Sequence, residues 1–179
     1  MKLNTLFDTI SPKIGGKIVF KRIILIVLIL FWSGCANKSL IKKENQESAF
    51  IVLKTPTIQY ADMGFIYKGD SFTKVEIYSM GQPIVSLNIN GMNVCMSTFK
   101  CMEKKDFNAK MLSSSYPDTL LENIFRAKPI FNKENLEQKD NGFIQKIKSD
   151  NYDITYSVDT NKTKFKDKKN KILIKIVKK

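Results

Sequence analysis

Residues 58–96 read IQYADMGFIYKGDSFTKVEIYSMGQPIVSLNINGMNVCM, and the spacing of their apolar runs sets the expected architecture. Turn residues separate the runs: Gly69-Asp70, Gly81-Gln82-Pro83 and Asn90-Gly91. Asn-Gly between two apolar runs is the strongest short-range signal for a β-hairpin. Together with one earlier run, the pattern predicts an antiparallel meander with strands at 50–53, 58–67, 72–78, 84–89 and 92–96.

Apolar and polar residues alternate within several runs, which is typical of a strand with one buried face. Val75 and Ile77 point to one side of their run and Lys74 to the other. The same alternation recurs at 152–158 and at 172–176. We therefore expect a mainly β domain whose sheet has one wet face.

The clearest helix is predicted at 117–127, because Pro117 suits a first turn and Lys128-Pro129 ends it. A second short helix at 132–138 is also compatible with the sequence. One helix of about three turns cannot seal a sheet of roughly eight or more strands, so the sheet must curl on itself. The interior is then either plugged by the helix or partly open to a ligand.

An unbroken apolar run, IILIVLILFW at 23–32, follows Lys21 and Arg22. It is half the length of a membrane-spanning helix and fits the apolar core of a signal peptide. Ser33-Gly34-Cys35 after it resembles a bacterial lipobox, which implies acylation of Cys35 and a lipid anchor in the outer membrane, facing the periplasm. A plain signal peptide or a short uncleaved anchor is the alternative. We divide the chain into a signal peptide at 1–34, acylated Cys35 with a flexible tether at 35–49, and one β-barrel-like domain at 50–179.

The formal charge of +13 first suggests nucleic acid as a partner. Without 1–34 the chain has 25 basic and 16 acidic residues, and 162–179 alone hold nine Lys and one Asp. The basicity thus belongs to the C-terminal segment, and Arg126 is the single Arg of the mature chain. A nucleic-acid surface needs a broad basic face, usually with Arg, so we expect no nucleic-acid partner.

The chain has no His, which excludes His-based triads and His-ligated metals. The sequence also has no phosphate-binding loop, nucleophile elbow or cluster of metal ligands. We expect neither enzymatic activity nor a metal or cofactor.

Cys95 and Cys101 become cross-strand neighbours if the chain turns at 97–99, and export permits a disulfide there. Two small buried thiols are the alternative.

The order of these features resembles a known family. A lipobox-like segment precedes the meander, Tyr78-Ser79-Met80-Gly81 forms a turn, and a hairpin follows at 90–94. One helix ends at Lys128-Pro129-Ile130, and a Tyr-rich strand at 152–156 is followed by KILIKIVKK at 171–179. Over most of 58–179 this pattern is similar to the outer-membrane lipoprotein receptor of the lipoprotein-localisation pathway, the LolB-like family.

The resemblance implies an antiparallel, strongly curved and unclosed β-barrel with a helical lid and an apolar cavity. That cavity would receive the acyl chains of lipoproteins from a periplasmic carrier and pass them to outer-membrane lipid. Met80 and Gly81 match the family's membrane-insertion loop, in which a bulky apolar residue stands beside Gly. The family usually has Leu after Pro, whereas Ser79 precedes Met80 here. We expect the protein to act as a monomer.

The predicted inner faces supply the candidates for the cavity wall: Val75, Ile77, Leu87, Ile89, Leu121, Ile124, Phe125 and Ile154. The same residues suit a packed core, and the alternative function is then a structural or interaction lipoprotein of the outer membrane without lipid cargo. A third alternative is a lipoprotein whose Lys-rich C-terminus binds anionic groups of peptidoglycan or lipopolysaccharide.

Overall fold

The computed structural model describes residues 45–97 and 99–179. The predicted signal peptide, Cys35 and most of the predicted tether lie outside the described residues. Contacts divide the chain into two units, 1–41 and 42–179, and the second unit holds every element described below.

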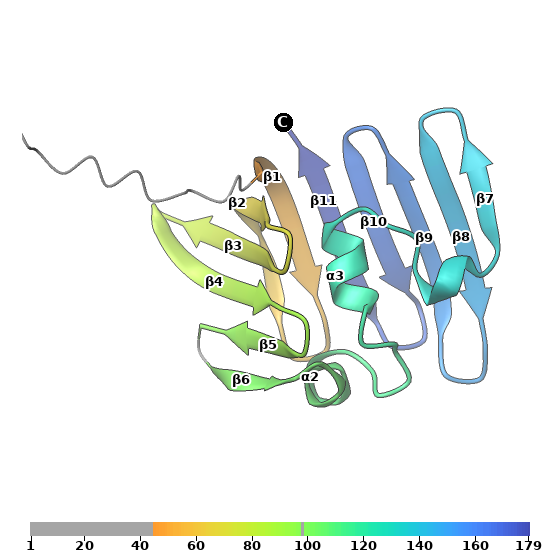
Figure 1. The fold of residues 1–179 in the computed structure, drawn as a ribbon, viewed down its shortest axis with the longest axis horizontal. Coiled ribbons are helices and arrows are strands. Elements are labelled where there is room, and N and C mark those ends of the chain that lie inside the picture. Colours follow the sequence, from red (N-terminus) through yellow and green to blue (C-terminus); the bar gives the residue numbers. More distant parts are fainter. Residues whose placement is uncertain (1–44, 98) are drawn as a thin grey trace, which may run out of the picture. The chain divides into compact units, whose positions relative to one another are not determined.

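One antiparallel sheet of 11 strands makes up most of this domain (Figure 1). In chain order the strands are β1 (Asn45–Lys54), β2 (Gln59–Lys68), β3 (Thr73–Ser79), β4 (Gln82–Ile89), β5 (Asn93–Met96), β6 (Phe99–Glu103), β7 (Leu136–Lys139), β8 (Gly142–Lys148), β9 (Asp153–Asp159), β10 (Lys162–Asp167) and β11 (Ile172–Lys178). β1–β6 form a first meander, β7–β11 form a second, and β1 pairs with β11 to join them. The outermost strands, β6 and β7, do not pair with each other, so the sheet is unclosed.

The strand registers place the apolar residues of neighbouring strands on one face. Val75 lies opposite Ile66 on β2 and Leu87 on β4, and Ile174 on β11 lies opposite Leu53 on β1. All five side chains are buried. The predicted meander and the expectation of strands with one buried face are therefore confirmed.

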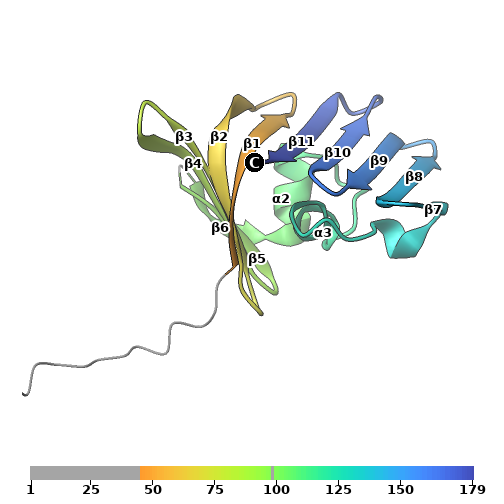
Figure 2. The ribbon, with the colours of Figure 1, turned by 90° about the horizontal axis from the view of Figure 1, so that it is seen from above.

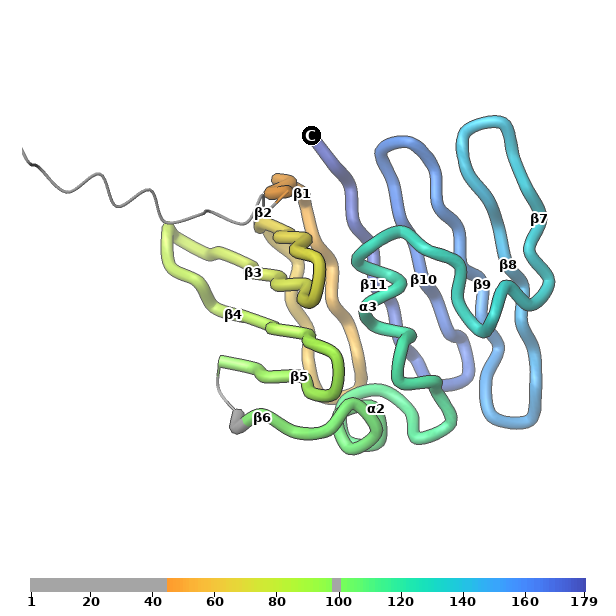
Figure 3. Tube along the Cα trace, in the orientation of Figure 1, coloured from red at the N-terminus to blue at the C-terminus, as the bar shows by residue number. Residues whose placement is uncertain are grey.

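Two α-helices connect the meanders: α2 (Lys104–Met111) and α3 (Leu120–Phe125). A short 3-10 turn, η1 (Phe131–Lys133), follows them. Figure 2 shows the sheet bent at β1 and β11, with both helices on the inner side of the bend. The tube in Figure 3 follows the chain from β6 through α2 and α3 to β7.

Two predicted boundaries and one predicted helix are wrong. The helix predicted at 117–127 is shorter, because 117–119 form a turn in which Leu120 N–H donates to Pro117 C=O, and Ala127 has a φ of 54°. The second short helix at 132–138 is absent, since η1 ends at Lys133 and β7 pairs with β8. The tether cannot extend to 49, because β1 pairs with β2 from Asn45 onward.

The buried apolar side chains form one core cluster between the sheet and the helices. It draws on both meanders and on both α-helices. The domain thus has its own core within the described residues, and a soluble form of the protein that begins at Ala36 contains all of it.

Candidate functional site

The eight residues predicted to line a cavity come together in one apolar cluster on the inner face of the sheet. Each exposes 3% or less of its surface, so in this structure they pack as a core. Five lie on strands and three on α3: Val75, Ile77, Leu87, Ile89, Ile154, Leu121, Ile124 and Phe125. We call this cluster the inner-face site.

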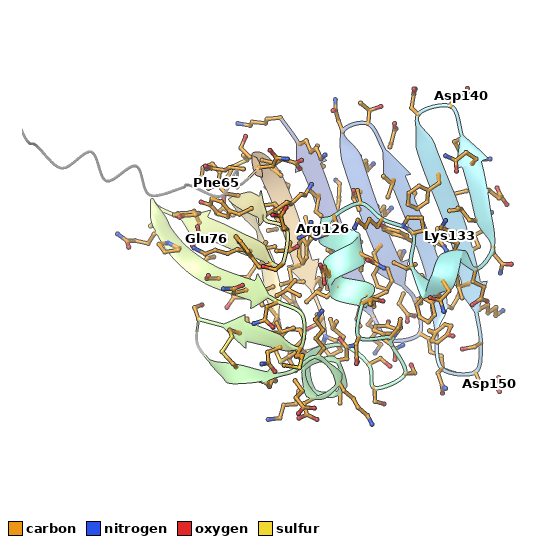
Figure 4. All side chains as sticks on the ribbon, viewed as in Figure 1. Phe65, Glu76, Arg126, Lys133, Asp140 and Asp150 are labelled. Atoms are coloured by element: carbon orange, nitrogen blue, oxygen red, sulfur yellow. A yellow bond between two sulfur atoms is a disulfide. The ribbon has the colours of Figure 1, made fainter. Side chains whose placement is uncertain are left out.

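Arg126 links the C-terminal end of α3 to the turn between β2 and β3 by hydrogen bonds. Figure 4 shows Arg126 at the end of the helix. Its Nη2 donates hydrogen bonds to the carbonyl oxygens of Gly69 (2.5 Å) and Phe72 (2.7 Å). Its Nε lies 3.2 Å from Glu122 Oε1, an ion pair without the geometry of a hydrogen bond. Arg126 therefore joins α3 to the first meander by polar contacts.

Two polar side chains of α2 join it to α3. Lys104 Nζ donates to Glu122 Oε2 at 3.1 Å, and only 8% of the Lys104 side chain is exposed. Asn108 Nδ2 donates to the carbonyl oxygens of Tyr116 (3.3 Å) and Pro117 (3.2 Å). Hydrogen bonds from α2 side chains thus link α2 to α3 and to the segment before it.

A buried carboxylate fixes the start of α3 to the second meander. Asp167 is 1% exposed and accepts hydrogen bonds from Tyr116 Oη (2.5 Å), Asn170 Nδ2 (2.7 Å) and the N–H groups of Asp153, Lys169 and Asn170. Burial opposes ionisation of this carboxyl, yet the hydrogen bonds outweigh it, and the pKa of Asp167 lies below its ordinary value. Burial, followed by the bond to Asp167, raises the pKa of Tyr116. A neutral phenol thus donates to an ionised carboxylate.

The segment after α3 is bound to the second meander as well. Gln145 on β8 is fully buried, and its Oε1 accepts from Ile130 N–H at 2.8 Å. Its Nε2 donates to the carbonyl oxygens of Ile130 (3.0 Å) and Glu134 (2.7 Å). Tyr156 Oη donates to Lys128 C=O at 3.0 Å, and burial raises the pKa of Tyr156. Both ends of α3 are therefore held on the second meander.

Met80 lies at the tip of the β3–β4 hairpin with a fully exposed side chain, at 101% of its reference area. The φ angles of Met80 and Gly81 are 50° and 78°, which suits a two-residue hairpin turn. A Cβ at Gly81 would meet nothing within 4 Å, so the glycine matters there for its backbone conformation and not for space. In this structure Met80 does not fold back onto the core.

Cys95 on β5 and Cys101 on β6 are joined by a disulfide bond, with their Sγ atoms 2.00 Å apart. The bond ties the edge strand β6 to its neighbour β5 in the first meander. Cys35, the predicted lipid anchor, lies outside the described residues.

A shallow hollow lies at the β7–β8 and β9–β10 turns, and none of the inner-face residues lines it. Its lining mixes Lys139, Lys162 and Lys164 with Asp140 and Asp159, so it presents charges of both signs. In residues 45–97 and 99–179, no three His, Cys, Asp or Glu gather in a way that could hold a metal ion. The helices in that part of the chain are also too short or too polar to cross a membrane.

Sequence reasoning missed Arg126, Asp167, Gln145 and Tyr116 as site residues. Arg126 could have been identified from the sequence, because it is the single Arg after the predicted signal peptide. Asp167 and Gln145 occupy inward positions of their strands, where the alternation calls for apolar residues. A polar residue at such a position indicates a buried hydrogen-bond network.

No protein-family model matches the chain, and no curated protein is similar to it at a level that would assign a family. The function is therefore argued from the geometry of the domain.

Proposed function

We propose that the protein is a lipid-anchored acceptor in the outer membrane, facing the periplasm. It holds acyl chains of lipoproteins between the inner face of the sheet and α3, and helps to insert them into the membrane. A periplasmic carrier delivers the cargo. In this proposal α3 acts as a lid and the inner-face site becomes an acyl cavity when the lid moves.

The observation that supports the proposal most strongly is the way in which the inner face is covered. The sheet is unclosed, and a helix of six residues covers part of its apolar face with four buried side chains: Leu120, Leu121, Ile124 and Phe125. Displacing so short a helix uncovers an apolar wall and breaks no strand pairing.

The energies of this exchange are nearly balanced. Exposing four large apolar side chains costs about 6–12 kcal/mol, and burying an acyl chain of about 16 carbons gains about 12 kcal/mol. A transfer protein needs such a balance, because it must bind its cargo and also release it. No catalytic step is required.

The exposed Met80 supports the membrane-insertion step. A flexible, fully exposed apolar side chain on a hairpin tip can enter the interface of a bilayer at little conformational cost. In this proposal Met80 and Gly81 form the membrane-insertion loop.

A packed interaction lipoprotein without cargo is the second candidate. The observation in its favour is the near-complete burial of all eight inner-face residues, which suits a permanent core. Under this function α3 never leaves the sheet.

The test is a transfer assay with acylated lipoprotein bound to its carrier. The soluble form from Ala36 should take the cargo, while Met80→Glu should take it but pass it poorly to liposomes, because the charge disfavours insertion. Met92→Glu is the matched control, since Met92 is 78% exposed on the β4–β5 turn, at the opposite end of the strands. Cargo that stays on the carrier with the unmodified domain would support the packed interaction lipoprotein instead.

A further inference from the structure

We propose that the outer face of the sheet around β1, β2, β10 and β11 docks on an anionic phospholipid bilayer, so that the domain lies on its side on the membrane. The docking surface consists of Phe50, Val52, Met63, Lys164, Lys175 and Val177, and we call it the basic–apolar face. The inference rests on the proposed function for the lipid anchor and for the role of Met80.

An apolar row crosses the outer face of the sheet. Phe50 on β1 lies opposite Met63 on β2 and opposite Val177 on β11. Its chain neighbours Ala49 and Ile51 point into the core, so Phe50 points away from the helices and is 37% exposed. Met63 and Val177 are half-buried, so the three side chains form one contiguous apolar row, and an apolar patch beside polar residues is the kind of surface that binds a partner.

Two lysines lie directly beside this row. Lys164 on β10 is opposite Lys175 on β11, and Lys175 is opposite Val52 on β1. Like charges directly opposite each other destabilise a pair of strands. None of the ion pairs in the described residues involves either lysine. An anionic partner would remove this repulsion.

The combination of apolar and basic groups favours a bilayer over an acidic protein. Apolar side chains enter the headgroup boundary of a membrane while lysines beside them bind anionic lipid. An acidic protein would satisfy the lysines but would leave the row of Phe50, Met63 and Val177 without a matching partner.

The position of the predicted anchor agrees with side-on docking. Cys35 precedes Asn45 by ten residues, which span at most about 33–36 Å. Asn45 starts β1 at one end of the strands, while the Met80 turn lies at the other end, about 20 Å further along β3. If the domain touched the membrane with its Met80 end alone, the segment from Cys35 to Asn45 would have to span about 20 Å, which is most of its maximum length. On its side, the domain brings both ends near the lipid.

The bend of the sheet brings the tip of the β3–β4 hairpin to a position from which it can reach the same membrane. In Figure 2 the β3–β4 turn points to the upper edge of the view, whereas the helices lie below β9–β11. The Met80 turn and the outer face of β10 and β11 are therefore both directed away from the helices. A bilayer against the basic–apolar face can also meet Met80.

The test is flotation of the soluble form from Ala36 with vesicles, without cargo or carrier. Vesicles of phosphatidylethanolamine with about one third phosphatidylglycerol should bind it, and vesicles of phosphatidylcholine alone should not. Lys164→Gln with Lys175→Gln should weaken binding by about 25-fold, at about fivefold for each lysine. These substitutions remove a repulsion, so the domain should fold as before. The control is Lys105→Gln with Lys110→Gln on the exposed side of α2, which should bind as the unmodified domain does.

Equal binding by the Lys164/Lys175 variant and the unmodified domain would overturn the proposal and leave an acidic protein as the partner of these lysines. Equal loss in the α2 control would also overturn it, because binding would then follow net charge alone. The vesicle assay contains no acyl cargo and the transfer assay scores uptake before vesicles are added. Failure of this inference is thereby distinguished from failure of the proposed function.

Discussion

At the scale of single residues, Asp167 shows how a charge is kept inside this domain. Burying a carboxylate is costly unless hydrogen bonds replace its water. Asp167 accepts them from the phenol of Tyr116, the amide of Asn170 and three backbone N–H groups. The carboxylate thereby connects β10, β9 and the segment before α3.

We predict that Asp167→Asn lowers the free energy of unfolding by about 1.5–3 kcal/mol at neutral pH, the range for hydrogen bonds to a charged group. The folded-state pKa of Asp167 lies below that of the unfolded chain, so the ionised carboxylate stabilises the fold above about pH 4. This stabilisation is lost as the pH falls through the folded-state pKa. Urea unfolding should therefore show a difference between the two proteins that is largest at pH 7 and shrinks toward pH 3. A difference that is the same at both pH values would show that the charge has no part in it.

At the scale of elements, α3 is bound asymmetrically. Its flanking segments are tied to the second meander through Asp167, Gln145 and Tyr156. Its polar attachment to the first meander is Arg126 at the β2–β3 turn. If the lid opens, the contact between α3 and the first meander is the one expected to part.

Arg126→Ala tests this asymmetry. Loss of two charged hydrogen bonds should lower the free energy of unfolding by about 1.5–3 kcal/mol, and uptake of a fluorescent fatty acid should become faster. Ile176→Val is the control, because it lowers stability by about 0.5–1.5 kcal/mol in the core and leaves the hydrogen bonds of Arg126 unchanged. Slower or unchanged uptake in Arg126→Ala, measured by stopped-flow fluorescence, would contradict the role of α3 as a lid.

Elements were predictable from the sequence where apolar residues alternate without interruption. β3, β4, β9 and β11 were therefore found, and so were the turns at Gly81 and Gly91. β10 was not, because Phe165 is its one large apolar residue and its inward neighbours are Thr163 and Asp167. The sequence therefore assigns the basicity to the C-terminal segment but predicts no strand at 162–167, which form β10.

β8 and α2 were missed for related reasons. Gln145 takes an inward position on β8 and so breaks the alternation between Phe143 and Ile147. α2 is polar on nearly all sides, and its buried members are Lys104, Phe107 and Asn108. Tertiary hydrogen bonds hold Lys104 and Asn108 in place, and a sequence pattern does not contain those contacts. The grouping of the eight inner-face residues was predictable because it needs only strand alternation and one helical stripe.

At the scale of the whole domain, two meanders share one apolar core and meet at the β1–β11 pairing. The inner face carries the residues proposed to hold acyl chains, and the outer face carries the lysines and apolar side chains proposed to meet lipid. An exposed methionine stands at one end of the strands. In the proposed account, cargo binding, membrane docking and insertion therefore use separate surfaces.

The most direct test of acyl binding is photo-crosslinking with a lipopeptide whose acyl chain bears a photoactivatable group near its end. After irradiation, mass spectrometry identifies the labelled residues of the soluble form from Ala36. We predict labels on α3 and on the inner faces of β3 and β4, at Leu121, Ile124, Val75 and Leu87. Labels confined to Met80 and the outer face, with none on these inner residues, would contradict the account.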